Sequence, residues 1–152
     1  KDYQYLNTSG CIEIEGVDDA KEFNDVLDAM KTLNFSEETM TNLLTAIAAI
    51  LHLGNIEFIN GDTGDDSSSK IAPSSNTALM VASKLLGLTK EDLTFALTCR
   101  NMATGTEIIL VKLSPAQAKD NRDSLTKMIY SNLFDWTIKQ VNKSLIGGDP
   151  LV

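Results

Sequence analysis

The sequence has few of the residues that build metal sites and covalent cross-links. Its 152 residues include 2 cysteines, 3 prolines and a single histidine, His52. One histidine excludes a histidine cluster around a metal ion. A chain of this length can bury a sufficient core without a disulfide, so we expect Cys11 and Cys99 to be free thiols in a reducing, cytosolic setting. We find no secretory signal and no apolar run long enough to cross a bilayer, and therefore expect no membrane insertion.

Positive charge is also scarce. The chain has 13 Lys and Arg against 21 Asp and Glu, which gives a formal net charge of −8. This charge opposes nonspecific attraction to nucleic acids and to anionic membranes. We therefore expect no nucleic-acid partner, and an acidic protein partner would have to be contacted by a local group of basic residues.

Helical periodicity dominates the first half of the chain. Between residues 16 and 34, Asp19 precedes Glu22 by three residues and is expected to cap a helix. This helix is expected to bury an apolar stripe at helical spacing, formed by Phe23, Val26, Leu27, Met30 and Leu33. A second helix is expected from Ser36 to just before Gly54. It has almost no polar face after its first turn, which predicts a central position.

The second half combines two short helices, a β-hairpin and a long helix. Gly87 is expected to end a third helix, and Thr89 to cap a fourth. Residues 98–113 alternate β-branched and polar side chains around an Ala-Thr-Gly turn, which predicts a β-hairpin. Residues 114–145 begin with a capping-box sequence and continue at helical spacing. The sequence therefore predicts a mainly α fold: one helical subdomain of about five helices with a small β-hairpin and a long C-terminal helix.

Residues 60–76 are predicted to form a flexible surface loop, because they are rich in Gly, Asp and Ser and contain Pro73. Asp62, Asp65 and Asp66 lie among glycines, but the ligand spacing and closing Glu of a calcium loop are missing. A solvated loop is the simpler interpretation.

Two other groups of residues have ordinary structural interpretations. His52 lies within an apolar run, where a hydrogen-bonded structural role is expected. Met128, Phe134 and Trp136 could form a binding stripe, but their spacing on a long amphipathic helix favours packing in a core.

Seven short motifs occur here in the order in which myosin motor domains have them. They are YLNTSGC at 5–11, GVDDAKEF at 16–23, AAILHLGNIEF at 48–58, LTCR at 97–100, QA at 117–118, RDSLTK at 122–127 and LFDW at 133–136. Each motif alone is weak, but together they span nearly the whole chain. The sequence therefore resembles the myosin motor family.

This resemblance implies a position within the motor. Residues 1–152 resemble the central part of the head, mostly the upper fifty-kilodalton subdomain, after the family's first switch and close to its second. The chain contains neither a G-x-x-x-x-G-K-S/T phosphate loop nor a D-x-x-G-F-E second switch, so we expect no cofactor in this segment. The resemblance implies that the parent is an actin-activated ATPase that uses Mg-ATP. It also implies a cytoplasmic motor of the actin cytoskeleton, with the rest of the head and the actin filament as partners.

The resemblance also implies which residues face actin. Hairpin 98–113 is similar to the family's cardiomyopathy loop, which lies on actin, and its candidates are Arg100, Asn101, Met102, Thr104, Gly105, Thr106, Glu107 and Ile108. Glu107, sixteen positions before Asp123, corresponds to a site that is acidic or phosphorylated in myosins. From the residues alone, the preferred interpretation is that Glu107 solvates one face of a strand. Loop 60–76 is similar to another actin-approaching loop, and its accessory candidates are Asp62, Asp65, Asp66 and Lys70.

Two alternatives remain open. A stand-alone helical interaction module would use the long helix to bind another protein, and exposed apolar residues on that helix would favour it. A self-contained hydrolase would require a pocket that brings His52, Cys99 and a carboxylate within hydrogen-bond reach.

Overall fold

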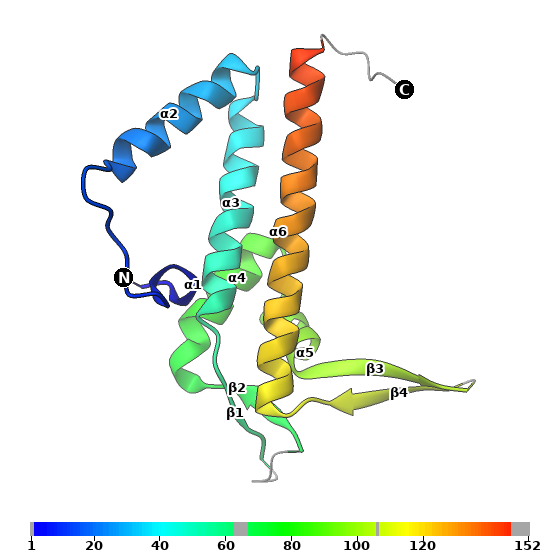
Figure 1. Ribbon diagram of the computed structural model, residues 1–152. Helices are drawn as coiled ribbons and strands as arrows, with labels where there is room; N and C mark the ends of the chain where they lie inside the picture. Colours follow the sequence, from blue (N-terminus) through cyan, green and yellow to red (C-terminus); the bar gives the residue numbers. More distant parts are fainter. Residues whose placement is uncertain (1, 63–66, 106, 147–152) are drawn as a thin grey trace.

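The computed structural model describes residues 2–62, 67–105 and 107–146 (Figure 1). Its elements are α1 (Gln4–Asn7), α2 (Asp19–Thr32), α3 (Glu37–Gly54), β1 (Phe58–Asn60), β2 (Ser69–Ile71), the 3-10 turn η1 (Pro73–Ser75), α4 (Asn76–Leu86), α5 (Lys90–Thr98), β3 (Cys99–Thr104), β4 (Glu107–Lys112) and α6 (Pro115–Leu145). The strands form two separate antiparallel pairs, β1 with β2 and β3 with β4. The predicted fold class is confirmed. Besides the five longer helices, the described residues include the four-residue α1.

Helix α3 is the centre of the fold, as its apolar composition predicts. The hydroxyl of Ser36 accepts a hydrogen bond from Thr39 N and so caps the helix. α3 packs against α4 and α6, and runs antiparallel to α6 (Figure 1). The main core cluster contains Leu53, Ile56, Leu79, Ala82, Leu93 and Leu97. This core lies where the C-terminal end of α3 meets α4, α5 and the first half of α6.

Helix α6 is 31 residues long and begins as predicted. Ser114 and Gln117 form a complete capping box, in which each side chain bonds the other residue's backbone N–H. At 1.5 Å per residue the helix is about 46 Å long. The other helices are too short to cover that length, so the buried residues of α6, namely Ala118, Arg122 and Thr126, all lie in its first half.

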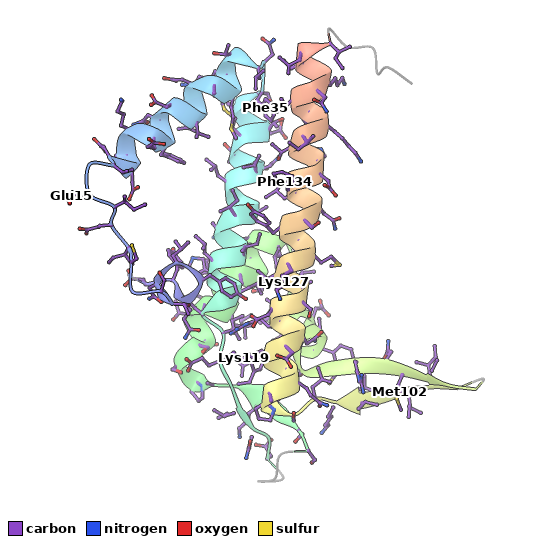
Figure 2. The ribbon with its side chains drawn as sticks, viewed as in Figure 1. Glu15, Phe35, Met102, Lys119, Lys127 and Phe134 are labelled. Atoms are coloured by element: carbon purple, nitrogen blue, oxygen red, sulfur yellow. The ribbon has the colours of Figure 1, made fainter. Side chains whose placement is uncertain are left out.

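The predicted core packing of Met128, Phe134 and Trp136 is wrong. Their exposed fractions are 55%, 56% and 39%. The C-terminal half of α6 lies beside α3 and the α2–α3 corner (Figure 2). There Trp136 makes an edge contact with Phe35 at 6.5 Å between ring centroids. The helical spacing correctly indicated apolar positions, but Phe35 covers only part of Trp136, and all three side chains stay substantially exposed.

The N-terminal part of the chain departs from the sequence expectation in two ways. The residue that caps α2 is Asp18, not Asp19: the Asp18 carboxylate accepts hydrogen bonds from Ala20 N and Lys21 N. The predicted buried stripe is also not buried, since α2 has no buried residue and Phe23 is 48% exposed. The reason is visible in Figure 1, where α2 diverges from α3 and lies apart from the other helices.

The surface loop is shorter than the predicted 60–76. β2 pairs with β1, and η1 continues directly into α4. The hydroxyl of the buried Ser75 accepts a hydrogen bond from Glu57 N, and the backbone N–H of Ala72 donates to Glu57 O. A loop remains between Asn60 and Ser69, of which residues 63–66 lie outside the described part.

Candidate functional site

The β3–β4 hairpin is the most prominent feature outside the helical body. It projects sideways from the base of α6 (Figure 1). Its register runs from Cys99 opposite Lys112 at the root to Thr104 opposite Glu107 beside the turn. Gly105 follows with a φ of 62°, a left-handed conformation that favours glycine in a tight hairpin turn. The predicted hairpin is therefore confirmed.

No other layer covers the described faces of this hairpin. Ile108 is 75% exposed and Leu110 52%, while Met102 and Ile109 are each 40% exposed. In a half-buried ribbon, apolar residues would alternate between a covered and a solvated face. Here exposed apolar side chains occur on both strands, beside the exposed Arg100. Clusters of this kind are typical of surfaces that bind another protein.

The predicted actin-facing residues can be placed as follows. Arg100, Asn101, Met102, Gly105 and Ile108 are all exposed on the hairpin. Thr104 and Glu107 pair across the rung nearest the turn. Thr106 lies outside the described residues. The strands therefore bring these candidates together on one projection, and whether they bind actin stays a prediction.

The accessory candidates occupy a separate place. Lys70, on β2, forms a 2.6 Å ion pair with Asp62. The hydrogen bond and positive charge of Lys70 hold the pKa of Asp62 below its ordinary value. Asp65 and Asp66 lie outside the described residues. The charge of Lys70 is thus already engaged within the chain.

His52 and Cys99, which a hydrolase site would have to bring together, contact different residues. His52 packs edge-on against the ring of Tyr3, with centroids 5.3 Å apart. Cys99 is the first residue of β3, and its thiol lies 3.8 Å from the Thr98 hydroxyl. Both cysteines are free, as expected. Among the described residues, no group of three or more His, Cys, Asp or Glu could hold a metal ion.

A junction on α6 was not predicted from the sequence, although its residues lie in the recognised 122–127 motif. Arg122 is only 3% exposed. Its guanidinium donates hydrogen bonds to the carbonyls of Gly54 and Ile56, at 3.2 and 2.5 Å. It also donates from Nε and Nη2 to Asp123 Oδ1, at 2.9 and 2.7 Å. The two charge-assisted bonds to carbonyls tie α6 to the C-terminal end of α3, and the bonds to Asp123 hold the guanidinium in place on α6.

Tyr5 connects the N-terminal segment to the same junction. Its hydroxyl donates to Asp123 Oδ1 at 2.5 Å, and its ring lies 5.7 Å from the Arg122 guanidinium carbon. A Cβ at Gly54 would come within 2.6 Å of the Tyr5 ring, so this close approach requires glycine. A sequence signal existed: Arg122 is spaced four residues from both Ala118 and Thr126, on the buried face of α6.

The contacts at this junction shift the pKa values of Asp123 and Tyr5 in opposite directions. Burial alone would raise the pKa of Asp123. Hydrogen bonds from Tyr5 and Arg122, together with the charge of Arg122, outweigh burial and lower it. Burial and the hydrogen bond to Asp123 raise the pKa of Tyr5. At neutral pH the junction therefore consists of a charged guanidinium, a carboxylate and a protonated phenol.

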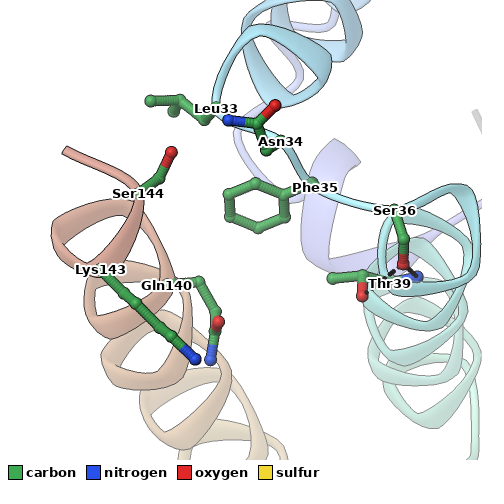
Figure 3. Close-up of a pocket in the computed structure, with 8 residues that line it drawn as sticks. All are labelled: Leu33, Asn34, Phe35, Ser36, Thr39, Gln140, Lys143 and Ser144. Atoms are coloured by element: carbon green, nitrogen blue, oxygen red, sulfur yellow. Dashed lines mark hydrogen bonds between the residues drawn. The ribbon is translucent and has the colours of Figure 1, made fainter. Parts of the chain in front are cut away.

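A cavity of about 440 Å³ lies between the α2–α3 corner and the end of α6 (Figure 3). The ring of Phe35 faces it from one side, and Gln140 and Lys143 line it from α6. Ser36 and Thr39, which also line it, are already engaged in the cap of α3. The cavity contains none of the candidate residues, and we assign no chemistry to it.

In the part of the chain that the structure describes, no helix has both the length and the apolar character of a membrane span.

Comparison with known proteins gives a consistent result. Residues 1–149 match the family described as myosin head (motor domain). Similar relatives from Arabidopsis thaliana include Myosin-3, 40% identical over 97% of this chain, Myosin-5, 43% identical over 97%, and Myosin-8, 41% identical over 99%. The chain spans only 10–12% of the length of these relatives. Together with the confirmed helical fold and hairpin, these matches establish that the chain belongs to the myosin head (motor domain) family.

Proposed function

We propose that this chain is a noncatalytic segment of a myosin motor and that its β3–β4 hairpin contacts the actin filament. The parent would be a cytoplasmic, actin-activated ATPase of the actin cytoskeleton, in which other parts of the head bind and hydrolyse Mg-ATP. This segment would shape the contact with actin and transmit it to the rest of the head.

The observation that carries this proposal is the exposure of the hairpin. A ribbon with apolar side chains on both strands gains free energy when a partner covers them, and Met102 and Ile108 are suited to act as anchors. Arg100 adds a local positive charge to a chain that is acidic overall. Arg100 is thus one basic residue on the hairpin that an acidic partner could contact.

Fewer observations support a contact between loop 60–76 and actin. Lys70 would have to give up its contact with Asp62 before it could bind an acidic surface. We therefore propose that Asp62, Asp65, Asp66 and Lys70 contribute little attraction to actin.

One observation favours the interaction-module alternative, because apolar residues on α6 are indeed exposed, among them Met128 and Phe134. The same exposure is expected of a segment that the rest of a myosin head covers. The relatives are about eight to ten times as long as this chain, which leaves ample further sequence to do so. We therefore propose that these faces bind the rest of the head.

The noncatalytic part of the proposal can be tested on the isolated chain. We expect no saturable binding of Mg-ATP, because the phosphate-binding loop and the magnesium ligands of phosphoryl-transfer sites are absent from the sequence. The measurement is calorimetric titration with Mg-ATP. Saturable micromolar binding that survives repurification would contradict it.

The actin part can be tested at Glu107, beside the hairpin turn. In the complete motor, Glu107→Lys is expected to reduce actin-activated ATPase, because the corresponding site in myosins carries negative charge, and to leave the actin-free rate nearly unchanged. The substitution exchanges one charged side chain for another and deletes no apolar residue, so the free energy of unfolding should change by about 0.5 kcal/mol or less. Glu107→Asp should be milder, because it keeps the charge.

Glu15→Lys is the matched control for this test. It makes the same charge reversal at an exposed site beside α2, far from the hairpin (Figure 2). Both variants are compared over a range of actin concentrations and by thermal unfolding. Equal actin activation of well-folded Glu107→Lys and the parent at every concentration would show that Glu107 has no role at actin.

A further inference from the structure

The root of the hairpin is the point where α5 ends and β3 begins. The last four carbonyl groups of an α-helix have no partner within the helix and need donors from elsewhere. In α5 these carbonyls belong to Phe95, Ala96, Leu97 and Thr98. The segments that donate hydrogen bonds to these carbonyls are held against the end of α5, and they therefore constrain the direction in which β3 leaves the helix.

Three different segments supply the donors. Cys99 N donates to Phe95 O, and Leu113 N, just after β4, donates to Thr98 O at 2.9 Å. The two remaining carbonyls are bound by a single side chain of α6. Asn121 Nδ2 donates to Ala96 O at 2.8 Å and to Leu97 O at 3.2 Å. An amide nitrogen has two hydrogens, so one residue can satisfy both.

The position of Asn121 in α6 makes these bonds more informative. The next residue, Arg122, holds the carbonyls of Gly54 and Ile56. Consecutive residues of α6 therefore bind the root of the hairpin and the exit of α3. The hairpin and the central helix are thus oriented against the same turn of the same helix.

We propose that Asn121 is a positioning residue that fixes the direction in which the β3–β4 hairpin leaves the helical body. The expected effect of Asn121 on activation by actin rests on the function proposed above, whereas its role in positioning the hairpin does not. Loss of the amide would leave Ala96 O and Leu97 O to bind water, since this site is only partly buried. The strand ladder would persist, but the end of α5 could move relative to α6.

Three substitutions of Asn121 test separately its hydrogen-bond donors, its shape and its length. Asn121→Ala removes the donors. Asn121→Asp keeps the shape but replaces the donor with a carboxylate, which only accepts hydrogen bonds and would repel the two carbonyls. Asn121→Gln keeps an amide donor on a longer chain. Asn132→Asp, at an exposed site on the same helix, is the matched control for the added charge.

The first readout is hydrogen exchange in the complete, actin-free motor. We expect Asn121→Ala and Asn121→Asp to speed amide exchange at residues 98–100 and 111–113 by about 2- to 10-fold, the range that the net value of a hydrogen bond implies. Exchange within α3 should not change, and Asn121→Gln should be closer to the parent. Unchanged exchange at the root, or an equal increase in α3, would overturn the proposal.

The second readout is the dependence of ATPase activity on actin concentration. A misdirected hairpin should raise the actin concentration needed for half-activation, with the actin-free rate unchanged and partial rescue in Asn121→Gln. Faster exchange at the root with normal actin activation would support the positioning role and contradict the actin-binding role of the hairpin. Weaker actin activation without faster exchange at the root would overturn the positioning role itself.

Discussion

Replacing Arg122 with alanine is expected to lower the free energy of unfolding of this chain by about 3–5 kcal/mol, the range found when one partner of a buried ion pair is removed. The guanidinium is almost completely buried and binds two carbonyls and one carboxylate. The substitution would leave Gly54 O and Ile56 O without their donor. It would also leave the half-buried Asp123 without its cation.

The matched control is Arg100→Ala, which makes the same chemical change at an exposed site on β3. It should change the free energy of unfolding by about 0.5 kcal/mol or less. Arg122→Lys should be intermediate, because an ammonium keeps the charge but lacks the planar fork that binds several acceptors at once. Urea unfolding, followed by the fluorescence of the single tryptophan, Trp136, measures all three. A difference under about 1 kcal/mol between Arg122→Ala and Arg100→Ala would contradict the assigned role.

The pH dependence provides an independent check. The pKa of Asp123 lies below its ordinary value of 3.8. Asp123 therefore contributes stability that is present above pH 3.8 and is lost as the pH falls through the lowered pKa. Arg122→Ala removes the hydrogen bonds and the charge of Arg122, two of the causes that lower this pKa, while burial and the Tyr5 hydrogen bond remain, so the pKa of Asp123 is higher in the variant. The difference in stability between the parent and Arg122→Ala should accordingly shrink as the solution is acidified.

The parts of the fold that could be predicted from the sequence depend on local chemistry. Ser36, Thr89 and Ser114 cap helices because their hydroxyl groups bind nearby backbone N–H groups. Gly87 ends α4 in the left-handed conformation that glycine favours. The hairpin was similarly predictable, since β-branched residues flank a short turn that contains glycine. None of these features depends on contacts between distant segments.

Apart from the cap of α2, which was placed one residue too late, the errors came from features that depend on packing between segments. Periodicity correctly indicated apolar faces on α2 and α6, but it cannot tell whether another part of the chain covers them. Phe23 and Phe134 have helical spacing like that of Leu53, yet both are about half exposed, whereas Leu53 is fully buried. Such faces are expected where a short segment belongs to a much longer head.

The candidate site was predictable only in part, for a similar reason. The exposed hairpin residues follow from a local pattern together with the resemblance to myosins. The junction at Arg122 requires Tyr5 and Gly54, which are distant in sequence and meet only in the folded chain. Asn121 acts on carbonyls 24 and 25 positions earlier. No periodicity links such positions.

The second large effect is expected when the hairpin is shortened. Cys99 and Lys112 face each other at its root, so residues 100–111 can be replaced by Gly-Gly without changing the ends of the ladder. The bond from Leu113 N to Thr98 O would remain, and the main core cluster contains no residue of the deleted segment. We therefore expect the motor to fold and to hydrolyse ATP without actin at the parental rate. Its activation by actin should fall by about tenfold or more, since the exposed apolar anchors and Arg100 are removed together.

The most direct test of the actin-contact proposal is the actin dependence of ATPase activity in this shortened motor, measured beside the parent and Glu15→Lys. We expect a much higher actin concentration for half-activation in the shortened motor alone, with equal actin-free rates and similar thermal unfolding in all three proteins. Actin activation of the shortened motor within about twofold of the parent, a difference of only about 0.4 kcal/mol, would show that the hairpin does not form a significant part of the actin interface.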